Sequence, residues 1–454
     1  MPCLRAGTDE PGTPIHVHVH PAHDRQTIDG FGGSLAYWGY DADEAALKHA
    51  FDDLGATLVR VPGDVPDGDQ YRAAMRRVSK LAPNAKVLVS FWQPRTAEKP
   101  DPADWLDKHP AGGLTLRPAL HGEWADAVVA RIKHMRDEWG LNVVAVSPQN
   151  EPNFSTDAWP TCRWDPPALA DFISKELAPR LAKSGMPVQI AGPEVAYLGG
   201  DASEAKKFRA AAAAGRIVCY HMYDSYKDGD ADGGFTTLRA RQAAFGHHLR
   251  ETLPGRQLWM TETSGAHWNT KEWHTLGWRP EMDEHSKAIA AGRYVHAALV
   301  DAGATAFFWW GLVYSAPPSS VKGAWERQKF RDEGLILVEP EKKDGVHTFK
   351  ERTRKYFALK QFARFIRPGW VRLAVTAEPT RLAAAFRSPD KKSVAVVLIH
   401  PDGIPDSFDV RVTGDGEYRL SKSYVTDRTR ECAALEWTGA APAESVTTLV
   451  YEVK

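Results

Sequence analysis

The sequence has few cysteines, no excess of charge of either sign and no long apolar run. Its four cysteines, Cys3, Cys162, Cys219 and Cys432, lie far apart and form no Cys-x-x-Cys pair, which argues against a zinc ribbon or a dense disulfide framework. The 57 Lys and Arg residues nearly balance the 58 Asp and Glu residues, so the charge gives no reason to expect nucleic acid or an anionic membrane as a partner. No apolar run reaches the length that spans a membrane.

The first residues, Met1 to Gly12, are polar and lack the hydrophobic segment of a secretory signal. We expect a secreted or periplasmic protein whose signal is absent from this sequence. A cytoplasmic location stays open as the alternative. The sequence gives no indication of the oligomeric state.

Short apolar runs alternate with longer amphipathic stretches from about Gly30 to Arg367, a pattern typical of a parallel α/β fold. Strands are predicted at Gly32–Tyr37, Thr57–Val61, Lys86–Trp92, Val143–Ser147, Val188–Ala191, Ile217–Tyr223, Gln257–Thr261 and Ala304–Trp310. Helices are predicted at Asp43–Asp53, Gln70–Leu81, Gly122–Trp139, Pro167–Ser184, Ala202–Ala214, Leu238–Glu251, Met282–Ala302 and Thr353–Phe365. These units predict a closed (β/α)8 TIM barrel, with its active site at the carboxyl ends of the strands. An open doubly wound sheet is the alternative, but no GxGxxG motif or P-loop follows a strand.

The pattern changes after Pro368–Gly369. Six strands separated by Pro, Gly and Asp turns are predicted, at Trp370–Val375, Arg381–Arg387, Ser393–His400, Phe408–Val412, Tyr418–Tyr424 and Thr447–Val453. We therefore expect an N-terminal segment at 1–28, a catalytic barrel at 29–367 and an all-β sandwich side domain at 368–454. The alternating run Ile15–His20 could add a strand to that sandwich.

Two glutamates follow predicted barrel strands at the end where such folds carry their active sites. Glu151 lies in Val146–Asn153 (VSPQNEPN), after the fourth strand, and Glu262 lies in Leu258–Gly265 (LWMTETSG), after the seventh. Glycoside cleavage needs two carboxyl groups that flank the anomeric carbon: one protonates the leaving oxygen, and the other attacks the carbon or activates water. Strands four and seven lie on opposing parts of a barrel wall, so the sequence predicts that the two side chains face each other across a sugar.

Four segments carry a resemblance to a known family. They are Thr27–Ser34 (TIDGFGGS), Ser147–Pro152 (SPQNEP), Leu258–Glu262 (LWMTE) and Phe365–Gly369 (FIRPG). They resemble glycoside hydrolase family 30 of the clan A retaining β-glycosidases. The late residues Ser445–Thr448 also resemble its side β-domain, so the resemblance covers nearly the whole chain.

The resemblance implies that Glu151 is the acid/base, that Glu262 is the nucleophile and that the reaction retains the anomeric configuration. Two carboxyl groups of a retaining pair lie about 5–5.5 Å apart. By the family pattern, Asn150 should hydrogen-bond the sugar 2-hydroxyl. Arg60, at the end of the second strand, resembles the arginine that keeps the nucleophile ionised in this clan.

Further candidate substrate-binding residues lie at other strand ends. His221 and Tyr223 end the sixth strand, and Tyr223 is expected to donate to Glu262. Glu194 follows the fifth strand and offers another polar contact. Three aromatic residues could form a floor under the sugar, and they are Trp92, Trp309 and Trp310. Because neighbouring strand residues face opposite ways, one of Trp309 and Trp310 should point into the barrel wall.

The substrate stays open. The resemblance implies a β-linked polysaccharide or oligosaccharide, of the xylan, 1,6-galactan, 1,6-glucan or glucoside class, and no metal or organic cofactor. The glucuronic-acid-dependent xylanases of the family carry an arginine-bearing loop after the eighth-strand tryptophans, whereas Gly311–Ser315 (GLVYS) contains no cation. The loops Ser315–Val346 and His267–Trp278 are expected to border the mouth and to choose the substrate.

Two alternative functions remain open for this sequence. His16-Val17-His18-Val19-His20 contains the His-x-His pattern that metal-dependent amidohydrolase barrels place on their first strand, where imidazoles bind zinc. These histidines, however, precede the first predicted barrel strand. A non-catalytic carbohydrate-binding barrel is the third possibility, although both carboxylates and their neighbours are present.

Overall fold

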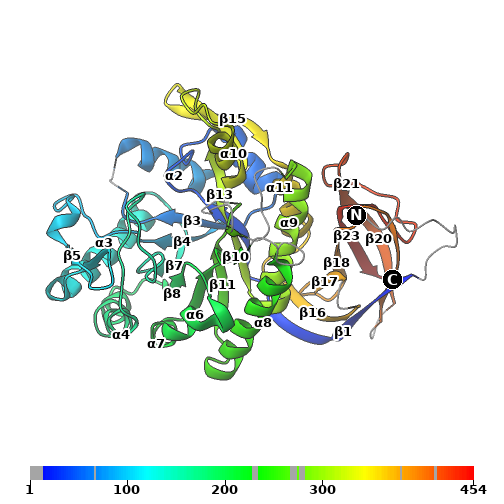
Figure 1. The fold of residues 1–454 in the computed structure, drawn as a ribbon, viewed down its shortest axis with the longest axis horizontal. Coiled ribbons are helices and arrows are strands. Elements are labelled where there is room, and N and C mark those ends of the chain that lie inside the picture. The colour runs from blue at the N-terminus through cyan, green and yellow to red at the C-terminus, as the bar shows by residue number, and fades with distance from the viewer. Residues whose placement is uncertain are drawn as a thin grey trace.

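The computed structural model describes residues 14–65, 68–227, 234–265, 273–275, 282–378, 381–413 and 417–454. Parallel strands of its larger sheet close into a barrel (Figure 1). They are β2 (Gly30–Ser34), β3 (Leu58–Pro62), β4 (Lys86–Ser90), β7 (Val143–Ser147), β8 (Gln189–Val195), β9 (Ile217–His221), β11 (Gln257–Glu262) and β13 (Ala306–Ser315). β13 closes the barrel, because it pairs with β11 on one side, where Trp259 is level with Ala306, and with β2 on the other. The predicted (β/α)8 barrel is confirmed.

Helices surround the barrel close to the predicted positions. They are α1 (Glu44–Lys48), α2 (Asp69–Leu81), α3 (His121–Asp137), α4 (Pro166–Asp171), α5 (Ala178–Lys183), α6 (Ser203–Lys207), α7 (Arg209–Ala214), α8 (Phe235–Thr252), α9 (Glu284–His296) and α11 (Arg354–Ala363). Asp43 and Asp283 begin α1 and α9 as N-caps, since their carboxylates accept backbone N–H groups of the first turn. Gly303 ends the last turn after α9 with a positive φ of 81°, a conformation that glycine adopts without strain.

The prediction of a long loop from Ser315 to Val346 is wrong. That stretch contains α10 (Ala324–Glu333) and β14 (Gly334–Lys343), and β15 (Val346–Arg352) follows. β14 extends the barrel sheet beyond β13 and pairs with β15 as a hairpin, which projects in yellow at the top of Figure 1. The run Leu335–Val338 is buried, and the many charges in α10 masked its helical period in the sequence.

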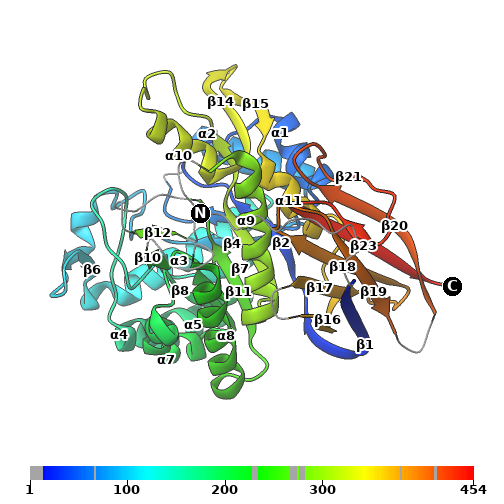
Figure 2. The ribbon, with the colours of Figure 1, turned by 45° about the vertical axis from the view of Figure 1, so that its right-hand side comes forward.

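The second sheet forms the all-β side domain, with nine strands in the order β21-β20-β23-β18-β17-β16-β1-β19-β22. They are β1 (Ile15–Thr27), β16 (Val371–Thr376), β17 (Leu382–Arg387), β18 (Ser393–His400), β19 (Asp406–Val412), β20 (Tyr418–Thr426), β21 (Ala433–Ala434), β22 (Ala440–Ala441) and β23 (Ser445–Val453). The N-terminal strand β1 lies between β16 and β19, as Figure 2 shows. The first and last strands of the described residues therefore lie in the same sheet.

Both faces of the sheet are buried at its central strand β18. Val394, Val396 and Leu398 of β18 face a core inside the side domain, whereas the alternate residues Ala395, Val397 and Ile399 join the core of the barrel. α9 and α11 lie between the barrel strands and the second sheet in both views (Figures 1 and 2). The double burial explains why the run Val394–Ile399 is apolar without alternation, and it joins the two domains through packed side chains.

Hydrogen bonds reinforce the junction between the two domains. Thr448 of β23 donates to the backbone carbonyl and the side-chain oxygen of Gln361 on α11, at 2.7 and 2.6 Å, and the Gln361 amide donates to Thr426 on β20. These groups are buried, so leaving any one of them without a partner would cost about 1–3 kcal/mol.

The amidohydrolase alternative is wrong. His16, His18 and His20 lie on β1, which pairs with β16 and β19 and not with a barrel strand. Their imidazoles therefore do not reach the carboxyl ends of the barrel strands. Within the described ranges, no helix combines the length and the apolar character needed to cross a bilayer.

The close approach of β2 and β3 generates a stability prediction. A Cβ added to Gly32 would lie 1.8 Å from the backbone oxygen of Leu58 on the neighbouring strand. Because the clash is with paired backbone, we expect Gly32→Ala to lower the free energy of unfolding by about 3 kcal/mol or more. Chemical denaturation measures the change. Gly200→Ala is the matched control, since nothing lies within 4 Å of its added Cβ; equal stability of the two variants would contradict the prediction.

Candidate active site

Backbone hydrogen bonds hold Glu151 and Glu262 at the same end of the barrel. Glu262 is the last residue of β11, and its carbonyl accepts the N–H of Met222, which follows β9, at 3.0 Å. Glu151 follows β7, and its N–H donates to the carbonyl of Glu194, near the end of β8, at 3.1 Å. Both Glu151 and Glu194 have a φ of +49°, which costs a non-glycine residue of the order of 1–3 kcal/mol. The barrel therefore holds strained backbone at this position.

The two carboxyl groups lie close together. An oxygen of Glu151, an oxygen of Glu262 and a ring nitrogen of His221 all lie within 4.8 Å of one another. Nδ1 of His221, the last residue of β9, is 3.0 Å from Oε1 of Glu151. Two carboxyl groups this close can act on opposite sides of one carbon atom, whereas a pair that places a water between them stands about 6.5–9.5 Å apart.

Arg60 joins the residues around this pair. It lies on β3 with its side chain fully buried. Nη1 donates to Glu262 at 2.6 Å, Nη2 donates to Asn150 at 2.6 Å, and Nε and Nη2 both donate to Glu194, at 3.0 and 3.3 Å. Nε also donates to Ser90 at 3.0 Å. One planar guanidinium therefore fixes side chains from four different strand ends.

The same contacts shift the pKa values of Arg60, Glu194 and Glu262. Burial opposes the charge of Arg60, but the neighbouring Glu194 and Glu262 outweigh burial and raise its pKa. Burial would raise the pKa of Glu194, but Arg60 and His221 hold it far below its usual range. The pKa of Glu262 is raised, first by burial and then by Glu151 and Glu194, against the opposing charges of His221 and Arg60. The form of Glu262 that Arg60 binds is the ionised one.

His221 is the second cation of the site. Burial opposes its charge, but the charge of Glu262, the hydrogen bond with Glu151 and the nearby Glu194 outweigh burial and raise its pKa to about 9. Its Nε2 lies 3.7 Å from Glu194 and 3.9 Å from Glu262. The predicted residues Glu151, Glu262, Asn150, Arg60, His221 and Glu194 are thus brought together in one cluster of contacts.

Two of the three tryptophans of the predicted aromatic floor, Trp92 and Trp310, lie together, whereas Trp309 lies apart from them. Trp92 stacks on the Arg60 guanidinium at 4.5 Å, and its ring centre lies 6.1 Å from that of Trp310, which is partly exposed. Trp309 is 1% exposed and stacks on Tyr294 of α9. As the alternation along a strand requires, Trp309 points into the barrel wall, so the prediction that it contacts substrate needs correction.

The contact predicted between Tyr223 and Glu262 is not a hydrogen bond in the structure. Among the described residues, no hydrogen bond joins the phenol of Tyr223 to Glu262, whose charge nevertheless acts on its pKa. Its ring lies 6.1 Å from that of His221. Burial, followed by the nearby charge of Glu262, raises the pKa of Tyr223 well above its usual value. Tyr223 therefore faces the nucleophile candidate without a direct hydrogen bond.

The structure adds an aromatic wall that the sequence did not reveal as a unit. Trp92 contacts Tyr37 at 5.4 Å between ring centres, Tyr37 contacts Trp38 at 5.8 Å, and Trp38 contacts Tyr314 at 5.8 Å. With Trp310, these rings form one continuous set, and Trp38 at its outer end is 44% exposed. Aromatic faces of this kind can stack on the C–H patches of sugar rings.

Two buried carboxyl groups near the site were also missed. Burial raises the pKa of Asp64, two residues after β3, to about 6, and raises the pKa of Glu333, at the end of α10, to about 7. Asp64 carries the same signal as the two glutamates, a charge just after a barrel strand. Glu333 carries no such signal, because its segment reads as a loop.

The loop His267–Trp278 lies outside the described residues except Trp273–Thr275, which form β12 and pair with β10 (Ser225–Lys227).

The charged groups of the site are paired with one another. Glu151, His221 and Glu262 offer atoms that a metal ion could bind, but Glu262 is already paired with Arg60, and Glu151 with His221. A second cluster, His400, Asp402 and Asp406, lies in the side domain, where Arg381 bridges the two aspartates.

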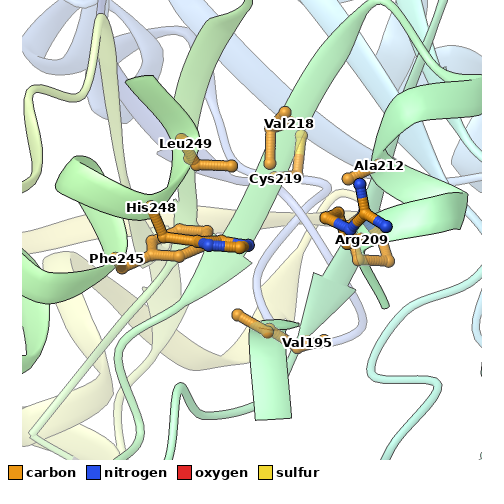
Figure 3. Close-up of a pocket in the computed structure, with 10 residues that line it drawn as sticks. Val195, Arg209, Ala212, Val218, Cys219, Phe245, His248 and Leu249 are labelled. Atoms are coloured by element: carbon orange, nitrogen blue, oxygen red, sulfur yellow. The ribbon is translucent and has the colours of Figure 1, made fainter. Parts of the chain in front are cut away.

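A small apolar cavity lies elsewhere, between β8, β9 and the helices that cover them (Figure 3). Phe245 and Leu249 of α8, Ala212 of α7 and Val218 of β9 line it. Its volume is about 10 Å³, roughly the room that one water molecule needs. This cavity cannot hold a sugar and is separate from the cluster around Arg60.

The comparisons with known proteins agree with this fold. No family model matches the chain. Glucuronoxylanase XynC of Bacillus subtilis strain 168 is 21% identical over 468 residues, with 98% of this chain and 94% of that protein covered. A glycoside hydrolase family 30 endoxylanase from Clostridium papyrosolvens C71 has a TM-score of 0.69 and 21% identity, with 96% and 100% covered. An endo-β1,6-glucanase has a TM-score of 0.65 and 19% identity, with 97% and 94% covered. The predicted resemblance to glycoside hydrolase family 30 is confirmed, and the shared fold spans nearly the whole chain.

The raised pKa of His221 generates a prediction about stability and pH. A histidine whose pKa is about 9 in the folded protein and about 6.5 when unfolded contributes stability that is fully present below about pH 6.5 and is lost as the pH rises through 9. We expect the stability of the parent protein to fall over this window relative to that of His221→Gln. Urea denaturation at pH 6, 7.5 and 9 checks this. His247→Gln, on the exposed face of α8, is the control. Parallel curves for parent and His221→Gln would contradict the assignment.

Proposed function

We propose that this chain is a retaining β-glycoside hydrolase that cleaves a β-linked polysaccharide or oligosaccharide by double displacement, with Glu151 as acid/base and Glu262 as nucleophile. The observation that carries the proposal is the approach of the two carboxyl groups, within 4.8 Å, at the carboxyl end of a (β/α)8 barrel. The names of the relatives, a glucuronoxylanase and an endo-β1,6-glucanase, support the same reaction class.

The reaction has two steps. In the first, a carboxylate oxygen of Glu262 attacks the anomeric carbon while Glu151 donates a proton to the glycosidic oxygen; the bond to the leaving group breaks and a glycosyl ester forms on Glu262. In the second, Glu151 takes a proton from a water molecule, whose oxygen attacks the same carbon and releases Glu262. Two inversions give net retention.

Arg60 and Glu194 keep the charges of the site balanced during this cycle. Arg60 binds the ionised Glu262 at 2.6 Å before attack. When the ester forms, Glu262 loses its charge, but Arg60 keeps its two hydrogen bonds with Glu194. The guanidinium therefore keeps its position in both steps. A charge that is already in place requires no rearrangement in the transition state.

Asn150 binds the substrate, and His221 orients the acid/base Glu151. The side-chain oxygen of Asn150 accepts from Arg60, which leaves its NH2 group to donate to a sugar hydroxyl. His221 holds the carboxyl of Glu151 at 3.0 Å and so fixes its direction. In the aromatic wall, Trp92 and Trp310 would stack against the face of a sugar ring.

The substrate class remains broad at this level: xylan, 1,6-galactan, 1,6-glucan or an oligosaccharide or glucoside. Polymers of this kind occur outside the cytoplasm, so we propose a secreted or periplasmic location. Fractionation of the producing cells tests the location independently of the chemistry.

Removal of either carboxylate gives a first prediction of activity. Glu262→Gln should lower kcat on aryl β-glycosides by about 10⁴-fold or more, because no nucleophile remains. Glu151→Gln should lose about as much on substrates with a poor leaving group but far less on dinitrophenyl glycosides, whose leaving group needs no proton. Steady-state kinetics with the two substrates measures this difference.

Glu339→Gln is the control for these variants. Glu339 lies on β14, pairs with Lys350 at the surface and should leave the kinetics unchanged. Equal losses of Glu151→Gln on both substrates, or activity of Glu262→Gln close to that of the parent, would contradict the assigned roles. Unchanged activity of both variants would favour a binding protein with contaminating hydrolase.

Stereochemistry gives a second prediction of activity. Direct attack by Glu262 requires that the first product released from a β-glycoside is the β-anomer. Proton NMR in the first minutes of hydrolysis, before mutarotation, distinguishes the anomers. The α-anomer as first product would mean that water attacks directly and that Glu262 is a base.

A further inference from the structure

A cluster of three metal-ligating side chains lies in the side domain, outside the proposed active site. His400 is the last residue of β18, and Asp406 is the first residue of β19. Asp402 lies in the connection between these strands. One possible ligand atom from each side chain lies within 4.8 Å of the other two. The chain therefore gathers one imidazole and two carboxylates from a stretch of seven residues.

Neighbouring strands fix the backbone of the three residues. His400 pairs with β23, and Asp406 pairs with β22. The N–H of Glu444 donates to the carbonyl of Asp402 at 2.8 Å. The connection Pro401–Pro405 (PDGIP) begins and ends with proline, whose ring fixes φ. The three side chains are therefore held on a backbone of limited freedom.

The imidazole of His400 has one nitrogen without a partner. The residue is 1% exposed. Its Nε2 lies 2.7 Å from the carbonyl of Ile404, and because a carbonyl only accepts, Nε2 carries a hydrogen. In the neutral imidazole, Nδ1 is then an acceptor, and no residue that the structure describes donates to it. Nδ1 lies 3.8 Å from Oδ2 of Asp402, which is too far for a hydrogen bond even with a proton on Nδ1. A cation bound by both groups would satisfy this buried nitrogen.

Negative charge is in excess around the cluster. Nη1 of Arg381 lies 2.7 Å from Asp402 and 3.2 Å from Asp406, and Nε lies 3.9 Å from Glu378. Three carboxylates therefore share one guanidinium in the part of the chain that the structure describes. A carboxylate has about four lone-pair sites, so both aspartates can bind a metal ion while they keep their contact with Arg381.

We propose that His400, Asp402 and Asp406 bind a divalent transition-metal ion such as Zn²⁺. The inference is independent of the proposed catalytic function. Zinc accepts imidazole nitrogen together with carboxylate oxygen, whereas Ca²⁺ and Mg²⁺ take oxygen ligands. Two ligands of a tetrahedral zinc ion lie about 3.4 Å apart, so the 3.8 Å between Nδ1 and Asp402 has to shorten only slightly. Asp402 is half exposed, which gives its side chain room to move and leaves a side of the ion open to water.

Zinc titration of the whole protein tests the proposal. Metal is first removed with a chelator, and binding is then followed by isothermal titration calorimetry in a buffer that does not bind zinc. We expect a site with a dissociation constant on the order of micromolar, and no comparable binding of Mg²⁺ or Ca²⁺. Asp402→Asn and His400→Gln should each weaken this site about tenfold or more, because each removes one ligand.

Two variants control for zinc bound elsewhere. His18→Gln removes an imidazole from the histidine-rich strand β1, and Glu262→Gln removes a possible ligand from the barrel cluster. Both variants should keep the zinc site. X-ray absorption spectroscopy of the loaded parent protein should find one imidazole among the ligands, whereas zinc bound along β1 would have two or more.

Unchanged zinc affinity in Asp402→Asn and His400→Gln, or loss of the site in His18→Gln or Glu262→Gln, would overturn the proposal. So would a parent protein that binds no zinc at concentrations up to about 1 mM, or a spectrum with two or more imidazoles. The spectrum of the parent tests the proposal even if a variant does not fold.

Discussion

The buried guanidinium of Arg60 is the interaction on which the site depends. It binds Glu262, Glu194 and Asn150 at once, and these residues come from separate strand ends. Loss of one partner from a buried ion pair typically costs about 3–5 kcal/mol, because the remaining charge has lost its compensation. The positions of the Glu262 and Glu194 side chains therefore depend on Arg60. Because Glu262 is one of the two carboxyl groups that act on the sugar, their separation depends on Arg60 as well.

The barrel and its side domain supply the rigidity that this cluster needs. Closure through β13 places β11 and β2 on either side of one strand, and the same strand carries Trp310 towards the mouth and Trp309 into the wall. The left-handed backbone of Glu151 and Glu194 is held because their loops are hydrogen-bonded to each other. A frame fixed on several sides can store such strain, and α9 and α11, packed between the two sheets, support it from outside (Figures 1 and 2).

Much of this arrangement follows from sequence patterns. The eight strands, and the placement of Glu151, Glu262, Arg60 and His221 at strand ends, are consequences of the α/β alternation and of parallel strands ending on one side. The burial of Glu333 does not follow from such a pattern, because its backbone is placed by the pairing of Gly334 with Gly311 on β13. Pairing between segments that are separate in sequence produces no local periodicity, so a sequence pattern cannot predict it.

The covalent intermediate offers the most direct test of the central claim, that Glu262 attacks a sugar carbon which Glu151 helps to activate. A 2-fluoro β-glycoside with a dinitrophenyl leaving group forms the glycosyl ester and slows its hydrolysis, so the ester accumulates. Mass spectrometry of the digested protein should then find one fluoroglycosyl group on the peptide that contains Glu262. A label on a different residue, or turnover without any covalent species and with inversion of the product, would contradict the account.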